Sequence, residues 1–138
     1  MPIASSLLNK PRLVKKLRDF YDYVNKNNGQ VGTKTRGIDL NFNNACNLRC
    51  KYCFTNSPKG DHVKEYLDIG AIRKLADEAD ELGYFEFDLQ GGELLLQPKK
   101  LFQVLEAIRP ERFYMYLTTN GYYLDESMAK RLAEYKVS

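Results

Sequence analysis

The chain has 138 residues, which is enough for one domain with a hydrophobic core and too few for two. Its hydrophobic fraction of 43% and charged fraction of 28% are typical of a soluble globular protein. No apolar run approaches the ~20 residues of a membrane helix, and we find no export signal, so we expect a cytoplasmic protein without a membrane partner. In that compartment thiols stay reduced, and clustered cysteines bind metals more often than they pair.

The net charge of +3 hides an asymmetry between two parts of the chain. Residues 1–36 contain eight Lys and Arg against two Asp, whereas the rest of the chain is net acidic. Such a basic arm suits an acidic partner, although a solvated amphipathic helix is the more ordinary interpretation. We expect no nucleic-acid partner, because no interleaved aromatic and Arg residues mark a nucleic-acid surface.

Hydrophobic spacing predicts one helix followed by three strand–loop–helix units. The first helix is expected over residues 11–25, and a polar linker follows it. Strands are expected at 38–42, 85–90 and 113–119, with helices that begin after Asp68, at Pro98 and near Asp125. Residues 135–138 resemble the opening of a fourth strand. We therefore predict a basic N-terminal helix and linker over 1–36 and three βα units of a larger, truncated domain over 37–138.

Strands that alternate with helices of this length predict right-handed βαβ units, and so an α/β fold with a parallel sheet. One side of the second strand is polar, with Glu86, Asp88 and Gln90, which suits a lumen that holds a polar ligand. In such architectures ligands bind at the carboxyl ends of the strands. The motifs of interest all follow predicted strands, at residues 46–53, 91–93 and 119–121.

Cys46, Cys50 and Cys53 are the three cysteines of the chain, with C-x3-C-x2-C spacing. A disulfide would leave an odd thiol, and a structural zinc site needs four ligands. The single histidine, His62, matches no zinc spacing, so we interpret it as structural. An iron–sulfur cluster fits better, because each thiolate can hold one iron and the fourth iron stays open, as is usual in catalytic metal sites. A non-catalytic zinc or iron–sulfur module is the alternative.

The stretch CNLRCKYCF resembles the cysteine motif of the radical S-adenosylmethionine (radical SAM) enzymes. Two further stretches resemble motifs of this family at the expected places, QGGELLL after the second predicted strand and LTTNG after the third. The resemblance covers roughly residues 37–138. It implies the first half of a partial (β/α)6, TIM-like barrel that binds a 4Fe-4S cluster and S-adenosyl-L-methionine (SAM). Leu94 stands where the family often has a proline, which affects loop rigidity and removes no functional group.

The resemblance also implies the site residues. The cysteines would ligate three of the four irons, and SAM would chelate the fourth through its amine and carboxylate. The aromatic residue before the last cysteine would lie beside the adenine, and the Gly-Gly-Glu segment would meet the methionyl amine. The predicted metal ligands are Cys46, Cys50 and Cys53, and the predicted cofactor contacts are Tyr52, Gly91, Gly92, Glu93, Thr118 and Asn120.

The implied activity is that of an oxidoreductase, in which reductive cleavage of SAM gives a 5′-deoxyadenosyl radical that takes hydrogen from a substrate. The electron would come from a low-potential donor such as flavodoxin or ferredoxin. We hypothesise that this acidic donor docks on the basic arm of residues 1–36, which neutralising Lys15, Lys16 and Arg18 would test. The cysteine motif is most similar to that of the peptide-modifying (SPASM-type) branch, which suggests a peptide substrate. Other branches of the family act on sugars, nucleosides or cofactor precursors, and these 138 residues do not choose among them. Because counterparts of the family's later SAM contacts are absent, we expect this segment alone to bind SAM poorly or be inactive.

Overall fold

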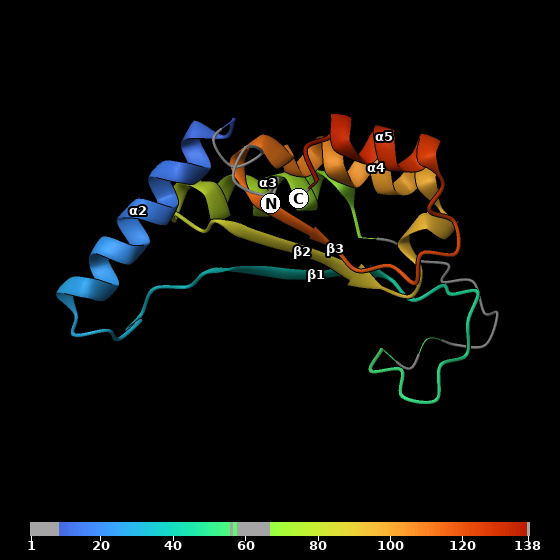
Figure 1. Ribbon diagram of the computed structural model, residues 1–138, viewed down its shortest axis with the longest axis horizontal. Helices are drawn as coiled ribbons and strands as arrows, with labels where there is room; N and C mark the ends of the chain where they lie inside the picture. The colour runs from blue at the N-terminus through green and yellow to red at the C-terminus, as the bar shows by residue number, and fades with distance from the viewer. Residues whose placement is uncertain (1–8, 56, 58–66, 138) are drawn as a thin grey trace.

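The computed structural model describes residues 9–55, 57 and 67–137. Its three strands form one parallel sheet in the order β1-β2-β3, and a helix separates each strand from the next (Figure 1). The predicted α/β fold, with parallel βα units behind an N-terminal helix, is confirmed. The elements in chain order are α2 (Pro11–Lys26), β1 (Gly37–Asn43), α3 (Ile69–Glu81), β2 (Glu86–Gly91), η1 (Leu94–Leu96), α4 (Pro98–Ile108), η2 (Pro110–Arg112), β3 (Tyr114–Leu117) and α5 (Glu126–Glu134).

The hydrophobic core lies between the sheet and helices α3, α4 and α5, which lie on one side of it (Figure 1). Phe87 on the central strand is paired in register with Ile38 of β1 and Met115 of β3. These apolar residues share one face because paired residues in a sheet point the same way. Along β2 buried and partly exposed residues alternate, so Glu86 and Asp88 face away from the core. The opposite face of the sheet is therefore polar, as predicted.

Side chains and backbone at the helix ends explain where the helices begin and stop. The Asp68 carboxylate accepts a hydrogen bond from the Ala71 amide at 2.8 Å and caps α3, as predicted. Asp125 caps α5 in the same way through the Met128 amide at 2.7 Å. Helix α4 ends at Ile108, because Arg109 follows with a left-handed φ of 60° and Pro110 cannot continue the helix. These local signals fix the lengths of the helices that cover the sheet.

Helix α2 packs against the end of the sheet where the strands begin (Figure 1). Lys16 is 7% exposed, and its ammonium group donates hydrogen bonds to the carbonyl oxygens of Tyr84 at 2.8 Å and Arg112 at 3.1 Å. It also lies 2.5 Å from a carboxylate oxygen of Asp80. The interpretation of this helix as simply solvated therefore needs a correction, because part of its charge is buried in the fold. The division of the chain at residue 36 stays a prediction.

Lys10 ties the start of α2 to the other end of the described chain. Its ammonium group donates to the carbonyl oxygens of Phe113 at 2.9 Å and Lys136 at 2.6 Å, and the residue is 2% exposed. Residues 135–137 form a turn after α5 rather than a strand, and Ser138 lies outside the described residues. The two hydrogen bonds thus join α2, the start of β3 and the turn after α5.

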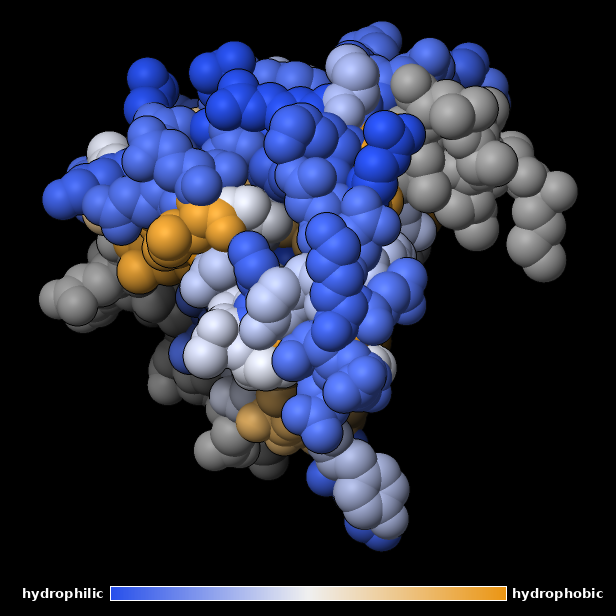
Figure 2. All heavy atoms as spheres, turned by 90° about the vertical axis from the view of Figure 1, so that its left-hand side faces the viewer, coloured by the Kyte–Doolittle hydropathy of each residue, from blue (hydrophilic) through white to orange (hydrophobic). Residues whose placement is uncertain are grey.

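The surface at the α2 end of the molecule is mostly hydrophilic (Figure 2). Scattered apolar side chains are exposed there, among them Tyr21 at 59% and Leu82 at 65%. Of the helices that the structure describes, none combines the length and the apolar character needed to cross a membrane.

Candidate functional site

The three predicted motifs meet at the carboxyl edge of the sheet. The loop that carries the cysteines leaves β1 beyond the strand arrowheads in Figure 1, at the end opposite α2. The Gly-Gly-Glu segment follows β2, and the turn with Asn120 follows β3. Parallel strands in the order β1-β2-β3 bring these segments together, although up to about 70 residues separate them in the sequence. The edge is therefore the candidate functional site.

The Gly-Gly pair packs directly against the base of the cysteine loop. The Gly92 amide donates to the carbonyl oxygen of Asn43 at 2.9 Å, and the Glu93 amide donates to that of Ala45 at 2.7 Å. A Cβ on Gly92 would lie 2.1 Å from the Ala45 carbonyl oxygen, and one on Gly91, where φ is 148°, would lie 2.1 Å from that of Asn43. These glycines are thus required by the approach of two backbones, whereas the sequence argument had emphasised the approach of a ligand.

Glu93 is fully buried, and its carboxylate accepts three hydrogen bonds. One oxygen accepts from the Leu95 amide at 2.8 Å and the Thr119 hydroxyl at 2.7 Å, and the other accepts from the Asn120 amide at 2.8 Å. A buried carboxylate needs such donors, because without them its desolvation is costly. Contact between Glu93 and a methionyl amine stays a prediction. Through these hydrogen bonds the side chain also links the ends of β2 and β3.

The turn after β3 reaches back to the cysteine loop. The Asn120 side-chain amide donates to the side-chain oxygen of Asn47 at 2.9 Å. Thr118, the other residue predicted in this turn, instead faces the polar side of the sheet, where its hydroxyl lies 3.4 Å from Asp88. Thr119 and Asn47 were not among the predicted site residues, although both lie inside the motifs that the sequence singled out. Only long-range pairing could have identified them.

The three cysteines are free and lie on one loop, with Cys46 half-buried and Cys50 and Cys53 exposed. The Cys53 amide donates to the carbonyl oxygen of Cys50 at 3.3 Å. The Cys53 sulfur is hydrogen-bonded to the Thr55 hydroxyl at 3.1 Å, and this bond is the main cause that lowers the pKa of the Cys53 thiol to about 7. A lowered pKa favours the thiolate, which is the form that binds iron.

The donor set fits an iron–sulfur cluster, although the thiols are not gathered around one point. Within the part of the chain that the structure describes, no three Cys, His, Asp or Glu side chains are arranged to hold a single metal ion. A cubane does not need such an arrangement, because each thiolate binds a different iron. Tyr52, predicted to lie beside the adenine, is 88% exposed in the same loop. His62 lies outside the described residues.

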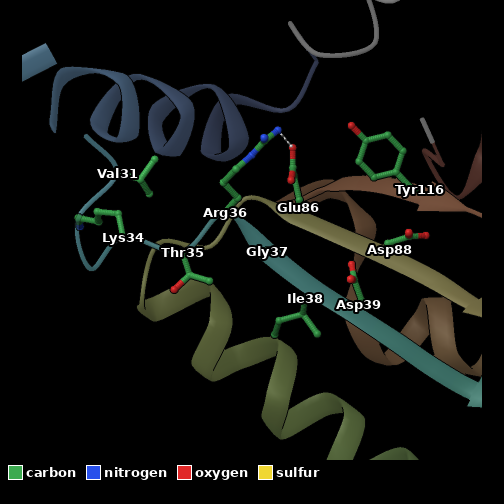
Figure 3. Close-up of a pocket in the computed structure, with 10 residues that line it drawn as sticks. All are labelled: Val31, Lys34, Thr35, Arg36, Gly37, Ile38, Asp39, Glu86, Asp88 and Tyr116. Carbon is green, nitrogen blue, oxygen red and sulfur yellow. Dashed lines mark hydrogen bonds and ion pairs between the residues drawn. The ribbon is translucent and has the colours of Figure 1, made fainter. Parts of the chain in front are cut away.

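A cavity of about 500 Å³ lies on the polar face at the opposite, amino-terminal end of the strands. Figure 3 shows Asp39, Asp88 and Tyr116 side by side on its wall, and Arg36 and Glu86 paired at its rim at 2.7 Å. Burial, and to a lesser extent the charge of Asp39, raises the pKa of Asp88. No predicted metal ligand or cofactor contact lines this cavity, so it is separate from the cysteine loop.

Comparison with known families identifies the class of protein. The model of the radical SAM superfamily matches residues 40–138, so the chain belongs to this superfamily, and the family suggested by the three motifs is confirmed. The enzymes of this superfamily use a 4Fe-4S cluster and SAM.

Individual relatives come from different branches of the family. A cysteine-type anaerobic sulfatase-maturating enzyme of Clostridium perfringens is 35% identical over 104 residues, which cover 66% of this chain and 28% of the relative. A probable GTP 3′,8-cyclase of Methanocaldococcus jannaschii is 31% identical, with 76% of this chain and 35% of the relative covered. A putative glycyl-radical enzyme activating enzyme of the same organism is 33% identical, with 62% and 32% covered. The chain thus spans about a third of the length of these relatives.

Proposed function

We propose that this protein is a radical SAM enzyme and that residues 37–138 form the part of it that holds the cluster. The observation that carries the proposal is three free thiols on one loop, joined at its base to a Gly-Gly-Glu segment by backbone hydrogen bonds. A bound cluster would relay an electron from a donor to SAM, which is the reductive chemistry that this site would supply. Family membership and the donor set support this assignment.

Cys46, Cys50 and Cys53 are the proposed iron ligands, one thiolate to each of three irons. Two of these thiols are exposed, so the loop has room to close around a group larger than a single ion. Tyr52 offers an uncovered aromatic face for stacking on a purine. The backbone of Gly91 and Gly92 lies beside the base of this loop, at the place proposed for the methionyl group.

The proposal includes a low-potential electron donor of the flavodoxin or ferredoxin type. Two observations weigh against its docking on the basic arm. Lys16, one of the basic side chains of that arm, is buried and paired with Asp80. Helix α2 also lies at the strand ends opposite the cysteine loop, and a seven-residue strand such as β1 spans about 23 Å. An electron would have to cross that length of protein from a donor on α2.

We further propose a peptide or protein as the substrate. Two of the relatives named above are a sulfatase-maturating and a glycyl-radical activating enzyme, names that denote action on other proteins. Exposed apolar side chains flank the site, with Tyr122 at 73% and Leu124 at 47% exposure immediately after the Asn120 turn. Such side chains suit a peptide, since large amphipathic rings dominate protein-recognition surfaces. The GTP cyclase relative makes a nucleotide the competing substrate class.

Anaerobic reconstitution with iron and sulfide tests the proposal. We expect about four irons and four sulfides per chain. Because this segment alone is expected to bind SAM poorly, the change in the visible spectrum with SAM and the 5′-deoxyadenosine after addition of dithionite are expected of a chain that also contains the later strands of the barrel. Cys50→Ser should lower the iron and sulfide content, whereas Arg49→Gln, a change in the same loop that removes no thiol, should not.

Two other outcomes would contradict the proposal. Stoichiometric zinc without sulfide would identify the alternative metal module. A stable cluster whose spectrum does not respond to SAM, both in this chain and in a longer one that contains the later strands of the barrel, would identify a non-catalytic iron–sulfur module.

A further inference from the structure

Asn120 occupies the point at which the three motifs meet. Its backbone amide donates to Glu93 at 2.8 Å, and its side-chain amide nitrogen donates to the side-chain oxygen of Asn47 at 2.9 Å. Its side-chain oxygen accepts from the Tyr122 amide at 2.9 Å. One residue after β3 thus contacts the segment after β2 and the loop after β1. Its own side chain is held in orientation by the turn that it forms.

The Glu93 end of this connection is rigid. Glu93 has no exposed surface, and its two oxygens also bind the Leu95 amide and the Thr119 hydroxyl. The Asn120 backbone is therefore fixed relative to β2. Because the Tyr122 amide occupies the Asn120 side-chain oxygen, the nitrogen is the atom left to face Asn47.

The hydrogen bonds that the structure describes within the cysteine loop are otherwise short-range. The Leu48 amide bonds the Cys46 sulfur, the Cys53 amide bonds the Cys50 carbonyl oxygen, and Thr55 bonds the Cys53 sulfur and the Ser57 hydroxyl. The bond from Asn120 to Asn47 spans 73 residues. It meets the loop at the residue next to Cys46, the least exposed of the three cysteines.

We propose that Asn120 is a positioning residue that holds the cysteine loop over the carboxyl edge of the sheet and thereby favours cluster binding. The effect on cluster binding rests on the proposed function, whereas the hydrogen bonds that hold the loop do not. Ordering a loop costs conformational entropy, and a loop already held at one point needs less ordering when a metal group binds. Loss of the bond should raise the equilibrium constant for opening of the loop about three- to tenfold, which is the effect of one ordinary hydrogen bond.

A pair of variants at Asn47 isolates this bond. Asn47→Ala removes the oxygen that accepts from Asn120 and leaves in place the Asn120 oxygen that accepts from Tyr122. Asn47→Asp keeps the acceptor and gives it a charge-assisted bond. The two variants at one surface position therefore differ in whether the hydrogen bond can form.

The first measurement is limited trypsin digestion of the metal-free protein, because Arg49 and Lys51 are exposed cleavage sites in this loop. The second is the rate at which reconstituted protein loses iron to a chelator. We expect Asn47→Ala to be cleaved at these sites, and to lose iron, about three- to tenfold faster than wild type. Asn47→Asp should behave like wild type in both measurements.

Equal effects of Asn47→Ala and Asn47→Asp would assign the result to the change at residue 47 itself and overturn the inference, as would no effect of either. Asn120→Ala removes the same bond from the other side and should give the same acceleration as Asn47→Ala. The digestion needs no cluster, so a wild-type protein that binds no iron and sulfide would contradict the proposed function while the digestion still decides the role of Asn120.

Discussion

Lys16→Met should destabilise the protein strongly, although Lys16 is one of eight basic residues in a segment that looks solvent-exposed in the sequence. The side chain is 7% exposed, with its nitrogen 2.5 Å from Asp80 and bonded to the carbonyl oxygens of Tyr84 and Arg112. Methionine keeps most of the apolar stem and removes the charge. The substitution thus tests the polar contacts rather than the packing of α2.

The expected loss in the free energy of unfolding is about 3 kcal/mol. Removal of one partner from a buried ion pair costs roughly 3–5 kcal/mol, because the other charge is left buried. Asp80 still has Arg12 at 2.7 Å and Arg112 at 3.5 Å as charged partners, so the lower end of this range applies. Burial also lowers the pKa of Lys16, which means that desolvation already opposes the charged form in the native protein.

Urea denaturation followed by circular dichroism at pH 7 measures this loss. Lys15→Met is the matched control, because Lys15 is the preceding residue, its side chain is 75% exposed and its partner Asp19 lies on the same helix. That variant should lose less than about 0.5 kcal/mol. If the two variants were equally stable, Lys16 would not contribute to the cooperative fold, and the account of α2 as part of it would be wrong.

Two further predictions concern single residues of the same fold. Gly92→Ala should lower the free energy of unfolding by about 3 kcal/mol in urea denaturation, because the new Cβ meets the Ala45 backbone. Gly83→Ala is the control: its φ is 82° but no atom lies near the new Cβ, so it should lose only about 1 kcal/mol. Equal losses in the two variants would contradict the packing argument. Burial lowers the pKa of Lys10 to about 8, while an unfolded lysine titrates near 10.4, so between these values the unfolded chain binds more protons. The free energy of unfolding should therefore rise from pH 8 to 10, by up to about 1.4 kcal/mol per pH unit, and Lys10→Met should lack this rise; the same rise in both proteins would refute the assignment.

The elements of the fold follow from local signals, which is why sequence could predict them. Asp68 caps α3 and Pro98 opens α4, and both act on their own helix within one turn. Alternation along β2 identifies which residues face the core, because successive side chains of a strand point to opposite sides. Parallel order then places the motifs at one edge. The cysteine loop was predictable for the same reason, since its three thiols are neighbours in the chain.

The polar interactions of the fold could not be predicted in this way, because they join residues far apart in the sequence. Charged residues are usually solvated, so nothing in the local pattern distinguishes Lys16, which binds Asp80, from the exposed Lys15. The sequence predicts that the Glu93 carboxylate contacts a ligand. Its burial in the fold depends instead on hydrogen-bond donors from the turn after β3. The irregularity of β1 between residues 41 and 43, which lets the Asn43 carbonyl meet Gly92, likewise appears only when β1 pairs with β2.

The burial of Glu93 changes how its loss should be interpreted. A protein that carries Glu93→Ala would leave the Leu95 and Asn120 amides and the Thr119 hydroxyl without their acceptor, and each unsatisfied buried donor costs about 1–3 kcal/mol. Because the Asn120 amide is among them, the bond to Asn47 and the position of the cysteine loop would change as well. Failure of such a variant to bind SAM would not by itself demonstrate contact between Glu93 and SAM. Only loss of SAM binding in a variant that keeps its stability and its cluster would do so, because the glutamate acts on the site through the fold before it can act on a ligand.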